Sequence, residues 1–171
     1  MTTTSAISTT SAAAIRPAVP ADAAALGKLG VLLMRLHHDF DPQRFIAPAA
    51  GTEHGYGAFL KSQLEEPDVI VLVAERNSRV IGYVYATVEG WDYMALRGPA
   101  GVLHDIVVAP DEQGQGVGRM LLDAALTALK ARGAPRVVLS TANRNETAQG
   151  LFARAGFRRT MIEMTREMDV G

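Results

Sequence analysis

The stretch VVAPDEQGQGVGRMLL, from Val107 to Leu122, decides the fold and carries the clearest chemical signal in the sequence. It begins as a β-branched strand, passes through a short loop and continues into a helix whose first turn holds Gly114, Gly116 and Gly118. Glycine lets the backbone approach a ligand without a Cβ clash, and a helix start offers unpaired N–H groups and positive partial charge. The segment therefore predicts an anion-binding turn, with Arg119 as a nearby cation. A turn that is merely tight is the alternative that the glycines alone leave open.

Two common nucleotide-binding motifs do not fit these letters. A Walker loop ends in Gly-Lys-Ser/Thr, whereas Gly118 is followed by Arg119 and Met120. The dinucleotide fingerprint requires a third glycine where the chain has Arg119. A doubly wound nucleotide-binding protein is therefore a minor alternative, and the pattern that remains is Gln113-x-x-Gly116-x-Gly118.

Strand and helix patterns alternate on both sides of this turn. Runs of β-branched and aromatic residues predict strands at 14–19, 69–74, 80–88, 102–109, 136–140 and about 157–168. Apolar residues at helical spacing predict helices at about 20–39, about 56–64, 116–132 and about 148–155. This mixed order without repeats is typical of one α/β domain, which we expect over residues 14–171. Residues 1–13 carry no charge and no apolar periodicity, which predicts a disordered tail.

Composition excludes several classes of function. The chain has 171 residues, with 17 Lys and Arg against 18 Asp and Glu, and it has no cysteine. Disulfides, thiolate metal sites and cysteine nucleophiles are therefore excluded, and the redox compartment is left open. A net charge of -1 without a basic cluster weighs against nucleic acid as a partner. The absence of a stretch of about 20 apolar residues weighs against a membrane span, and we expect a cytoplasmic protein.

Two motifs in this order resemble the Gcn5-related N-acetyltransferase (GNAT) superfamily. Gln113-x-x-Gly116-x-Gly118, preceded by Val108-x-Pro110, is similar to the acetyl-CoA signature of that family. The second motif of the family is similar to Asn145-x-x-Ala148-x-x-Leu151-Phe152-x-x-x-Gly156-Phe157. The resemblance covers residues 14–168 and implies a GNAT fold, with about four helices around a mixed, mostly antiparallel sheet of about six to seven strands. It also implies an acetyl-CoA-dependent N-acetyltransferase without a metal.

The resemblance further implies which residues bind the cosubstrate. The CoA pyrophosphate would be held beside Arg119 by the backbone of Gln113, Gly114, Gln115, Gly116, Val117 and Gly118. The strand edge at Ile106, Val107 and Val108 would pair with the pantetheine amides in the manner of an added strand. Asn145 would reach the pantetheine arm across a gap between splayed strands, or it would serve only as a helix cap. Phe152 is also expected among the residues that bind the cosubstrate.

Acetyl transfer to an amine requires a base, because the amine is protonated at neutral pH. His104 is the leading candidate, since imidazole titrates near neutral pH and several amine-acetylating members of the family carry His or Glu at this place. The alternative is an interior histidine, with a water chain as the base. Asp105 is the second candidate. It would point to the opposite face of a regular strand, although a bulge would change that.

Phe152 is a departure from the family, many members of which carry a tyrosine that is thought to protonate the leaving thiolate. Tyr83, Tyr85 or water could replace that proton donor. The backbone N–H of Val108 would polarise the thioester carbonyl, and the amine would attack directly in a ternary complex. The rival hypothesis is a module that binds or senses acyl-CoA without turnover.

The acceptor is expected to be a small amine, an amine-bearing antibiotic or a protein amino group. Its pocket is expected between residues of about 35–60 and the 89–101 loop. The adjacent histidines His37 and His38 could suggest a metal site. Neighbouring residues on a helix point about 100° apart, however, so these two histidines are expected to lie on a solvated face of the helix. The polar alternation of the last predicted strand would let it extend a sheet across a two-fold axis, which makes a homodimer possible.

Overall fold

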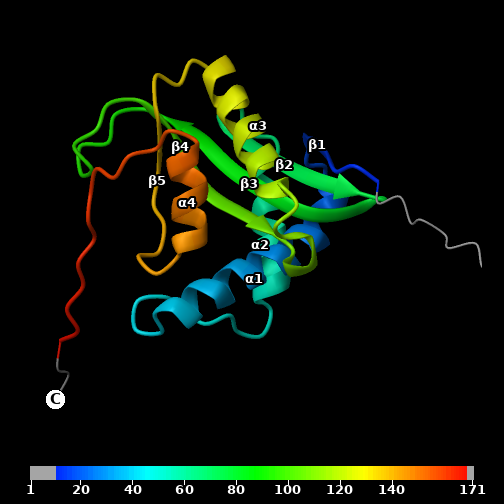
Figure 1. Ribbon diagram of the computed structural model, residues 1–171, viewed down its shortest axis with the longest axis horizontal. Helices are drawn as coiled ribbons and strands as arrows, with labels where there is room; N and C mark the ends of the chain where they lie inside the picture. The colour runs from blue at the N-terminus through cyan, green and yellow to red at the C-terminus, as the bar shows by residue number, and fades with distance from the viewer. Residues whose placement is uncertain (1–10, 169–171) are drawn as a thin grey trace, which may run out of the picture.

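The computed structural model describes residues 11–168 of the chain (Figure 1). Its helices are α1 (Ala23–Phe40), α2 (Thr52–Gln63), α3 (Val117–Ala131) and α4 (Glu146–Arg154), with short 3-10 turns η1 (Pro20–Asp22) and η2 (Pro110–Glu112). Its strands are β1 (Ala14–Pro17), β2 (Val69–Arg76), β3 (Arg79–Glu89), β4 (Ala100–Val108) and β5 (Val137–Leu139).

The strands form one mixed sheet in the order β1-β2-β3-β4-β5. The first four are antiparallel to their neighbours, whereas β5 runs parallel to β4. The turn between β2 and β3 places Asn77 and Ser78 at positive φ angles of 50° and 59°. Such a turn matches the twist of the flanking strands, which explains why the two strands form a hairpin.

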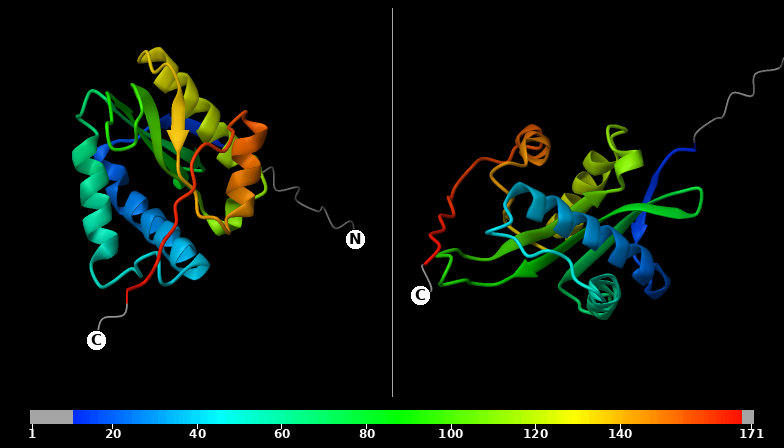
Figure 2. Two further views of the ribbon diagram at one scale, coloured as in Figure 1. Left: turned by 90° about the vertical axis from the view of Figure 1, so that its left-hand side faces the viewer. Right: turned by 90° about the horizontal axis from the view of Figure 1, so that it is seen from below.

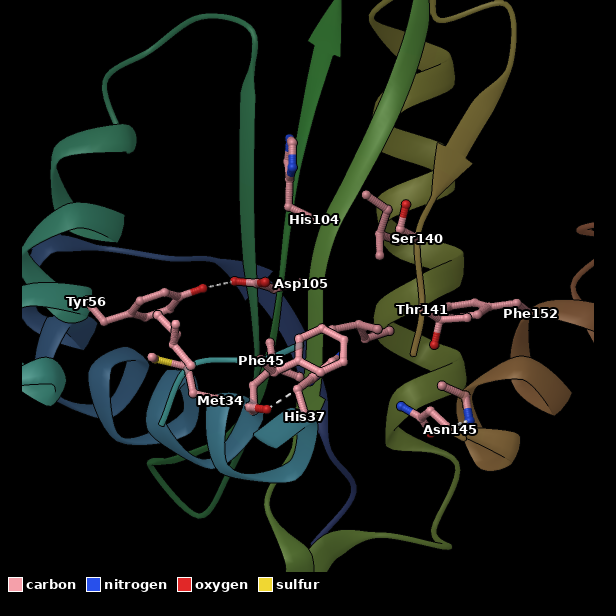
Figure 3. A pocket seen from close by; sticks show the side chains of 15 residues that line it. Met34, His37, Phe45, Tyr56, His104, Asp105, Ser140, Thr141, Asn145 and Phe152 are labelled. Carbon is pink, nitrogen blue, oxygen red and sulfur yellow. Dashed lines mark hydrogen bonds between the residues drawn. The ribbon is translucent and has the colours of Figure 1, made fainter. Parts of the chain in front are cut away.

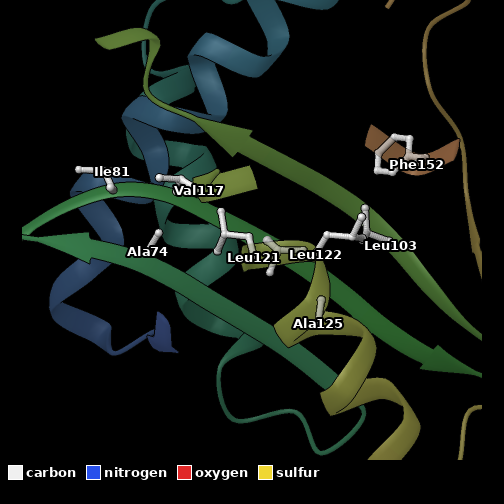
Figure 4. Packing of buried hydrophobic residues seen from close by; sticks show 9 residues of the cluster. Ala74, Ile81, Leu103, Val117, Leu121, Leu122, Ala125 and Phe152 are labelled. Atoms are coloured by element: carbon white, nitrogen blue, oxygen red, sulfur yellow. The ribbon is translucent and has the colours of Figure 1, made fainter. Parts of the chain in front are cut away.

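Helices cover both faces of the sheet. On one face α3, with Leu121 and Leu122 fully buried, packs on β2, β3 and β4 together with Phe152 of α4 (Figure 4). On the other face lie α1 and α2 (Figure 2). Leu26 of α1 and Leu60 of α2 pack there against β2 and β3. The result is a three-layer α/β/α arrangement with a separate apolar core on each side of the sheet.

The β4 and β5 strands diverge after a short paired region. Their pairing runs only from Gly101 opposite Val137 to Leu103 opposite Leu139. Within the described chain, residues 104–108 of β4 therefore have no strand neighbour on the β5 side, and this edge is available to a ligand.

The predicted last strand is wrong, and the strand count of six to seven falls to five. Phe157–Met168 lies outside the helices and strands of the described chain, and its side chains from Arg158 onward are exposed. A strand requires a hydrogen-bonded neighbour, and the alternation of side chains does not report whether one is present. The other predicted elements are confirmed, with shifts at their ends. Most of the predicted N-terminal tail lies outside the described residues.

None of the helices within residues 11–168 combines the length and the apolar character that a membrane span requires.

Candidate active site

A cavity of about 240 Å³ opens where β4 leaves β5 (Figure 3). Its wall on the α1 and α2 side consists of Leu33, Met34, His37, Phe45, Ile46 and Tyr56. Its floor on β4 consists of Leu103, His104, Asp105 and Ile106. The opposite wall, from the end of β5 and from α4, consists of Ser140, Thr141, Asn145, Ala148 and Phe152.

A β-bulge brings both predicted catalytic residues to this cavity. Tyr85 of β3 lies opposite Asp105 and the next residue, Ala86, lies opposite Leu103, so His104 has no counterpart on β3. The extra residue changes the alternation of side chains, so that His104 and Asp105 both lie on the face of the sheet that α1 and α2 cover. The imidazole of His104 accordingly stacks on Tyr85, with ring centroids 4.9 Å apart.

A chain of hydrogen bonds sets the tautomer of His104. The Thr87 hydroxyl donates to Glu89 Oε1 at 2.8 Å, and the same hydroxyl oxygen lies 2.8 Å from His104 Nε2. Because a hydroxyl has one proton, Thr87 must accept from His104, so Nε2 carries the proton of the neutral ring. The other nitrogen, Nδ1, then has the lone pair that a base needs. The His104 side chain is 34% exposed, so a proton can reach it from the cavity or through water.

Glu89 is itself held in the charged form. Burial opposes ionisation, but hydrogen bonds from Thr87 and Arg97 outweigh it and lower the pKa of Glu89. Arg97 lies on the 89–101 loop with a side chain only 16% exposed, and it pairs with Glu89. A negative charge therefore stands 3.4 Å from His104 Nε2, where it stabilises the imidazolium that forms when the base takes up a proton.

Asp105 is bound by two tyrosines. Its Oδ2 accepts hydrogen bonds from the hydroxyl of Tyr56 and, at 3.0 Å, from that of Tyr83. Burial and the charge of Asp105 raise the pKa of both tyrosines, so they remain protonated donors. With two donors attached, Asp105 is well placed to fix α2 against the sheet and to present negative charge to the cavity.

The glycine-rich turn follows the C-terminal end of β4, just beyond the part of the strand that lines the cavity. Gly114 and Gly116 have φ angles of 76° and 81°, which only glycine adopts readily, and Gly116 forms the N-cap of α3 without a side-chain cap. The first N–H groups of α3 therefore lack partners within the helix. Gln113 folds back, and its Nε2 donates to the carbonyl oxygen of Val108 at 3.1 Å.

Arg76 braces this turn, a role that the sequence analysis misses. Its guanidinium pairs with Glu112 and donates to Gln115 Oε1 at 2.7 Å. The side chains of Arg76 and Glu112 are only 10% and 11% exposed. The link depends on how the β2–β3 hairpin folds over η2, and no local spacing in the sequence reveals it.

The remaining predicted cosubstrate residues divide into two groups. Ile106, Asn145 and Phe152 line the cavity, together with His104 and Asp105. The Gln113–Arg119 turn, Val107 and Val108 do not line it.

Three of the predicted cosubstrate residues also have a structural role within the protein. Asn145 caps α4, since its Oδ1 accepts from the N–H of Ala148 at 3.1 Å. Phe152 is 6% exposed and belongs to the core. Arg119 pairs with Asp123 at 2.8 Å, so its charge is partly neutralised by a carboxylate of its own helix.

The backbone of β4 presents polar groups toward the gap. Ala109 donates its N–H to Ile81 of β3 at 2.8 Å. In an antiparallel pair the backbone groups of alternate residues point the same way, so those of Ile106 and Val108 point away from β3. The contact of Gln113 with the Val108 carbonyl fits this direction.

Only one of the two segments that were expected to line the acceptor pocket does so. Residues from the 35–60 region line the cavity, but the 89–101 loop does not, and it reaches the site only through Arg97 and Glu89. Trp91 and Tyr93 are 70% and 76% exposed and flank Asp92, which forms an isolated β-bridge with Arg97. His37 lines the cavity, and its Nδ1 lies 2.9 Å from the Leu33 carbonyl oxygen. No His, Asp and Glu cluster within residues 11–168 could hold a metal ion.

Comparison with known proteins identifies the family. The profile of the acetyltransferase (GNAT) family matches residues 33–157. An uncharacterized N-acetyltransferase of Bacillus subtilis, YhfO, is 30% identical over 145 residues, which cover 84% of this chain and 88% of that protein. The chain therefore belongs to the acetyltransferase (GNAT) family, and it is an enzyme of the N-acetyltransferase class.

Two further relatives extend the comparison. The mycothiol acetyltransferase of Cellulomonas flavigena is 34% identical over 96 residues, which cover 54% of this chain but only 28% of that longer protein. The structure of the aminoglycoside N-acetyltransferase AAC(6')-Iy in complex with CoA superimposes with a TM-score of 0.72 at 18% identity, covering 96% of this chain and 99% of that one. This likeness confirms the GNAT fold.

Proposed function

We propose that this protein transfers the acetyl group of acetyl-CoA to a primary amine by direct attack in a ternary complex. The observation that carries the proposal is the environment of His104: a bulge residue with a free Nδ1, beside a cavity and next to an open strand edge. Family membership supports the reaction, and the CoA bound to the aminoglycoside N-acetyltransferase supports the cosubstrate.

The cosubstrate would lie along the open edge of β4. The backbone of Ile106 and Val108 would pair with the pantetheine arm, and the turn from Gln113 to Gly118 would bind the pyrophosphate. Gly118 supports the second assignment, because a Cβ there would meet only ordinary contacts at 3.7 and 3.8 Å. Since its φ is not positive either, the fold does not require glycine at this place, whereas close approach of a ligand would.

The chemical step begins with the protonated amine. His104 Nδ1 accepts a proton from it, directly or through one water, and the neutral nitrogen attacks the thioester carbonyl. The N–H of Val108 stabilises the developing oxyanion. The attacking nitrogen then loses its second proton to water and the carbon–sulfur bond breaks, which yields the neutral amide and the CoA thiolate.

The leaving thiolate would take its proton from the imidazolium of His104 or from water. Phe152 has no proton to give. Tyr83 is fully buried and its hydroxyl binds Asp105, so it cannot reach the cavity. A thiol with a pKa of about 8.5 leaves adequately without a dedicated acid, so the missing tyrosine slows the step and does not prevent it.

We propose an acceptor amine attached to an apolar body. The α1 and α2 wall is mostly apolar, through Leu33, Met34, Phe45 and Ile46, while Asp105 offers a carboxylate that suits the ammonium group. This lining favours a small apolar amine over the polycationic aminoglycosides or a peptide. We expect 2-phenylethylamine to give a higher kcat/KM than spermidine, an aminoglycoside or a short peptide.

Release of CoA, followed with a thiol reagent, tests the proposal directly, because the cysteine-free protein gives no background signal. We expect His104→Gln to lower kcat by about 100-fold or more, with acetyl-CoA affinity retained. If Asp105→Asn removes turnover and His104→Gln does not, Asp105 is the base. If acetyl-CoA binds but no amine on the panel is acetylated, the result favours the rival hypothesis of a module that senses acyl-CoA without turnover.

Three broader expectations are proposals as well. Residues 14–171 act as one domain, the protein works in the cytoplasm, and it forms a homodimer. Cell fractionation tests the second, and the unpaired C-terminal segment supports the third.

A further inference from the structure

The acceptor side of the cavity offers one polar side chain that is not already committed to the protein. The wall on this side comes from α1, α2 and their connection, and it consists of Leu33, Met34, His37, Phe45, Ile46 and Tyr56. Four of these six side chains are apolar, and the hydroxyl of Tyr56 donates to Asp105. His37 is therefore the residue of this wall whose polar group can still meet an acceptor.

A backbone contact sets the tautomer of His37. Its Nδ1 lies 2.9 Å from the carbonyl oxygen of Leu33, one turn earlier on α1 (Figure 3). A carbonyl oxygen only accepts, so Nδ1 carries the proton and Nε2 of the neutral ring has a free lone pair. Within residues 11–168 this Nε2 has no hydrogen-bond partner, yet it is not a buried atom, so it remains accessible.

Two aromatic neighbours hold the ring of His37 in place. Phe45 meets it edge-to-face with ring centroids 5.0 Å apart, and Phe40 does so at 6.3 Å. Together with the contact to Leu33, these neighbours fix the direction of Nε2 before an acceptor binds. Little side-chain freedom is then lost when Nε2 forms a hydrogen bond, which makes it an effective recognition group.

A purely apolar acceptor would cover Nε2 without giving it a partner, because Met34 and Phe45 line the cavity together with His37. Covering a polar atom in this way costs more free energy than a typical hydrogen bond returns. An acceptor that places a hydroxyl group at Nε2 avoids the cost. A second ammonium group would instead have to lose its hydration beside apolar side chains. A neutral hydrogen-bond donor therefore fits this wall best.

We infer, on the basis of the proposed acetyl transfer, that His37 selects the acceptor by accepting a hydrogen bond at Nε2 from a hydroxyl group on the apolar body of the amine. Asp105 attracts the ammonium group of the same molecule, so the acceptor is held at two points of the cavity. The preferred acceptor is an arylalkylamine with a hydroxyl group on its ring. His37 is a specificity residue and has no part in the chemical step, which depends on His104.

A graded set of amines tests the inference. Tyramine and its meta isomer carry the hydroxyl group, 2-phenylethylamine lacks it, and 4-methoxyphenylethylamine keeps the oxygen but not its proton. For the wild type we expect at least one hydroxylated amine to exceed the other two compounds in kcat/KM by about 10-fold. Equal kcat/KM values for all of them overturn the inference and leave the proposed function intact.

Substitutions of His37 separate recognition from catalysis. His37→Phe keeps an aromatic ring beside Phe40 and Phe45 but removes Nε2, so it is expected to lower kcat/KM about 10-fold more for tyramine than for 2-phenylethylamine. His37→Gln offers an amide oxygen and is expected to restore part of the preference. If His37→Phe lowers kcat/KM for every amine by the same factor, His37 does not read the hydroxyl group and the inference is wrong.

The matched control is His54→Phe. His54 is an exposed residue of α2 that does not line the cavity, so this variant is expected to keep the full preference for the hydroxylated amine. Loss of the preference in this control would also contradict the assignment to His37.

Calorimetric titration of the amines in the presence of CoA measures the preference without turnover. Tighter binding of tyramine than of 2-phenylethylamine by the wild type, but not by His37→Phe, supports the inference even if no amine is acetylated, in which case the proposed function alone fails. The affinity of His37→Phe for CoA, measured first, shows that the variant is folded. Equal affinities of the wild type for the two amines, or no binding of either, contradict the inference.

Discussion

The orientation of His104 depends on two side chains of the neighbouring strand. The hydroxyl of Thr87 accepts a hydrogen bond from His104 Nε2 and donates one to Glu89, while Arg97 keeps Glu89 charged. This arrangement leaves Nδ1 as the only basic nitrogen of the neutral ring. When His104 is held in this tautomer, little of the enzyme carries the other tautomer, in which Nδ1 is protonated and cannot act as a base. The supporting residues therefore affect turnover without touching the substrate.

Thr87→Val tests this relay. Valine has the same shape but neither accepts nor donates, so we expect kcat to fall by about 10-fold or more, with little change in acetyl-CoA affinity. Steady-state kinetics measure kcat, and equilibrium binding measures the affinity for acetyl-CoA.

The matched control is Thr87→Ser, which keeps the hydroxyl and is expected to retain most activity. Equal activity of the Val and Ser variants would show that His104 does not depend on the relay.

The sequence predicts His104 and Asp105 as candidates because both lie on the strand that leads into the glycine-rich turn. It does not predict that they face the same cavity, nor that Thr87, Glu89 and Tyr56 support them. Those relations depend on the bulge, and therefore on the register between β3 and β4, which neither strand encodes by itself.

At the level of elements, the start of α3 depends on the left-handed conformation of Gly116. Its φ is 81°, and a Cβ there would meet nothing within 4 Å, so only the backbone conformation opposes a larger residue. Gly116→Ala is therefore expected to lower the free energy of unfolding by about 1 kcal/mol. Urea denaturation provides the measurement.

Gly55 is the matched control, because it lies inside α2 and a Cβ there would also meet nothing within 4 Å. Without a positive φ, Gly55→Ala is expected to raise the free energy of unfolding by about 0.4–1 kcal/mol. The expected result is that the two substitutions change the free energy of unfolding in opposite directions. If both substitutions lower it, the left-handed conformation of Gly116 is not the cause of the effect at that site.

The junction between β1 and α1 is expected to weaken in acid. Asp22 accepts from Arg16, and also from the N–H of Val19 at 2.8 Å. The hydrogen bond from Arg16, with smaller contributions from Val19 and the opposite charge, lowers the pKa of Asp22 against the effect of burial. A carboxyl whose folded pKa is depressed contributes stability above its unfolded pKa of about 3.9 and loses it as pH falls through the folded value.

Unfolding free energies measured from pH 7 down to below pH 4 check this prediction. Asp22→Asn is expected to be less stable than wild type at pH 7 and to lose less stability on acidification. Parallel pH profiles for the two proteins would exclude Asp22 as a source of acid sensitivity.

The last predicted strand shows where element prediction from sequence stops. Periodic patterns identify α1, α3, β2 and β3, because long runs with one buried side leave a clear trace. Residues 157–168 also alternate, but alternation describes the side chains of a strand and not its partner. A segment that pairs only with another copy would give the same pattern as one that pairs within the chain.

At the level of the whole molecule, the sheet separates two apolar cores. Leu60 and Leu121 are both fully buried, on opposite faces. Each substitution to Ala is expected to lower the free energy of unfolding by about 2–5 kcal/mol. Because the two sites share no partners, the double variant is expected to show the sum of the single effects within about 0.5 kcal/mol.

Leu36→Ala, at a position 41% exposed, is the control and is expected to change stability by less than about 0.5 kcal/mol. Chemical denaturation of the four variants tests the separation of the cores. If the effect of the double variant differs from the sum of the single effects by much more than about 0.5 kcal/mol, the two cores are energetically coupled through the sheet.

The gap beside β4 has a consequence for how much folded protein a cell holds. The chain's own sheet is incomplete from residue 104 to 108, and the proposed cosubstrate would occupy that place only in the native state. A ligand present at about 100 times its dissociation constant stabilises the native state by about 2.7 kcal/mol. Abundance would then follow acyl-CoA supply: when the thioester runs short, more chains would open and reach proteases, so the cell would lose the enzyme when it has no substrate for it.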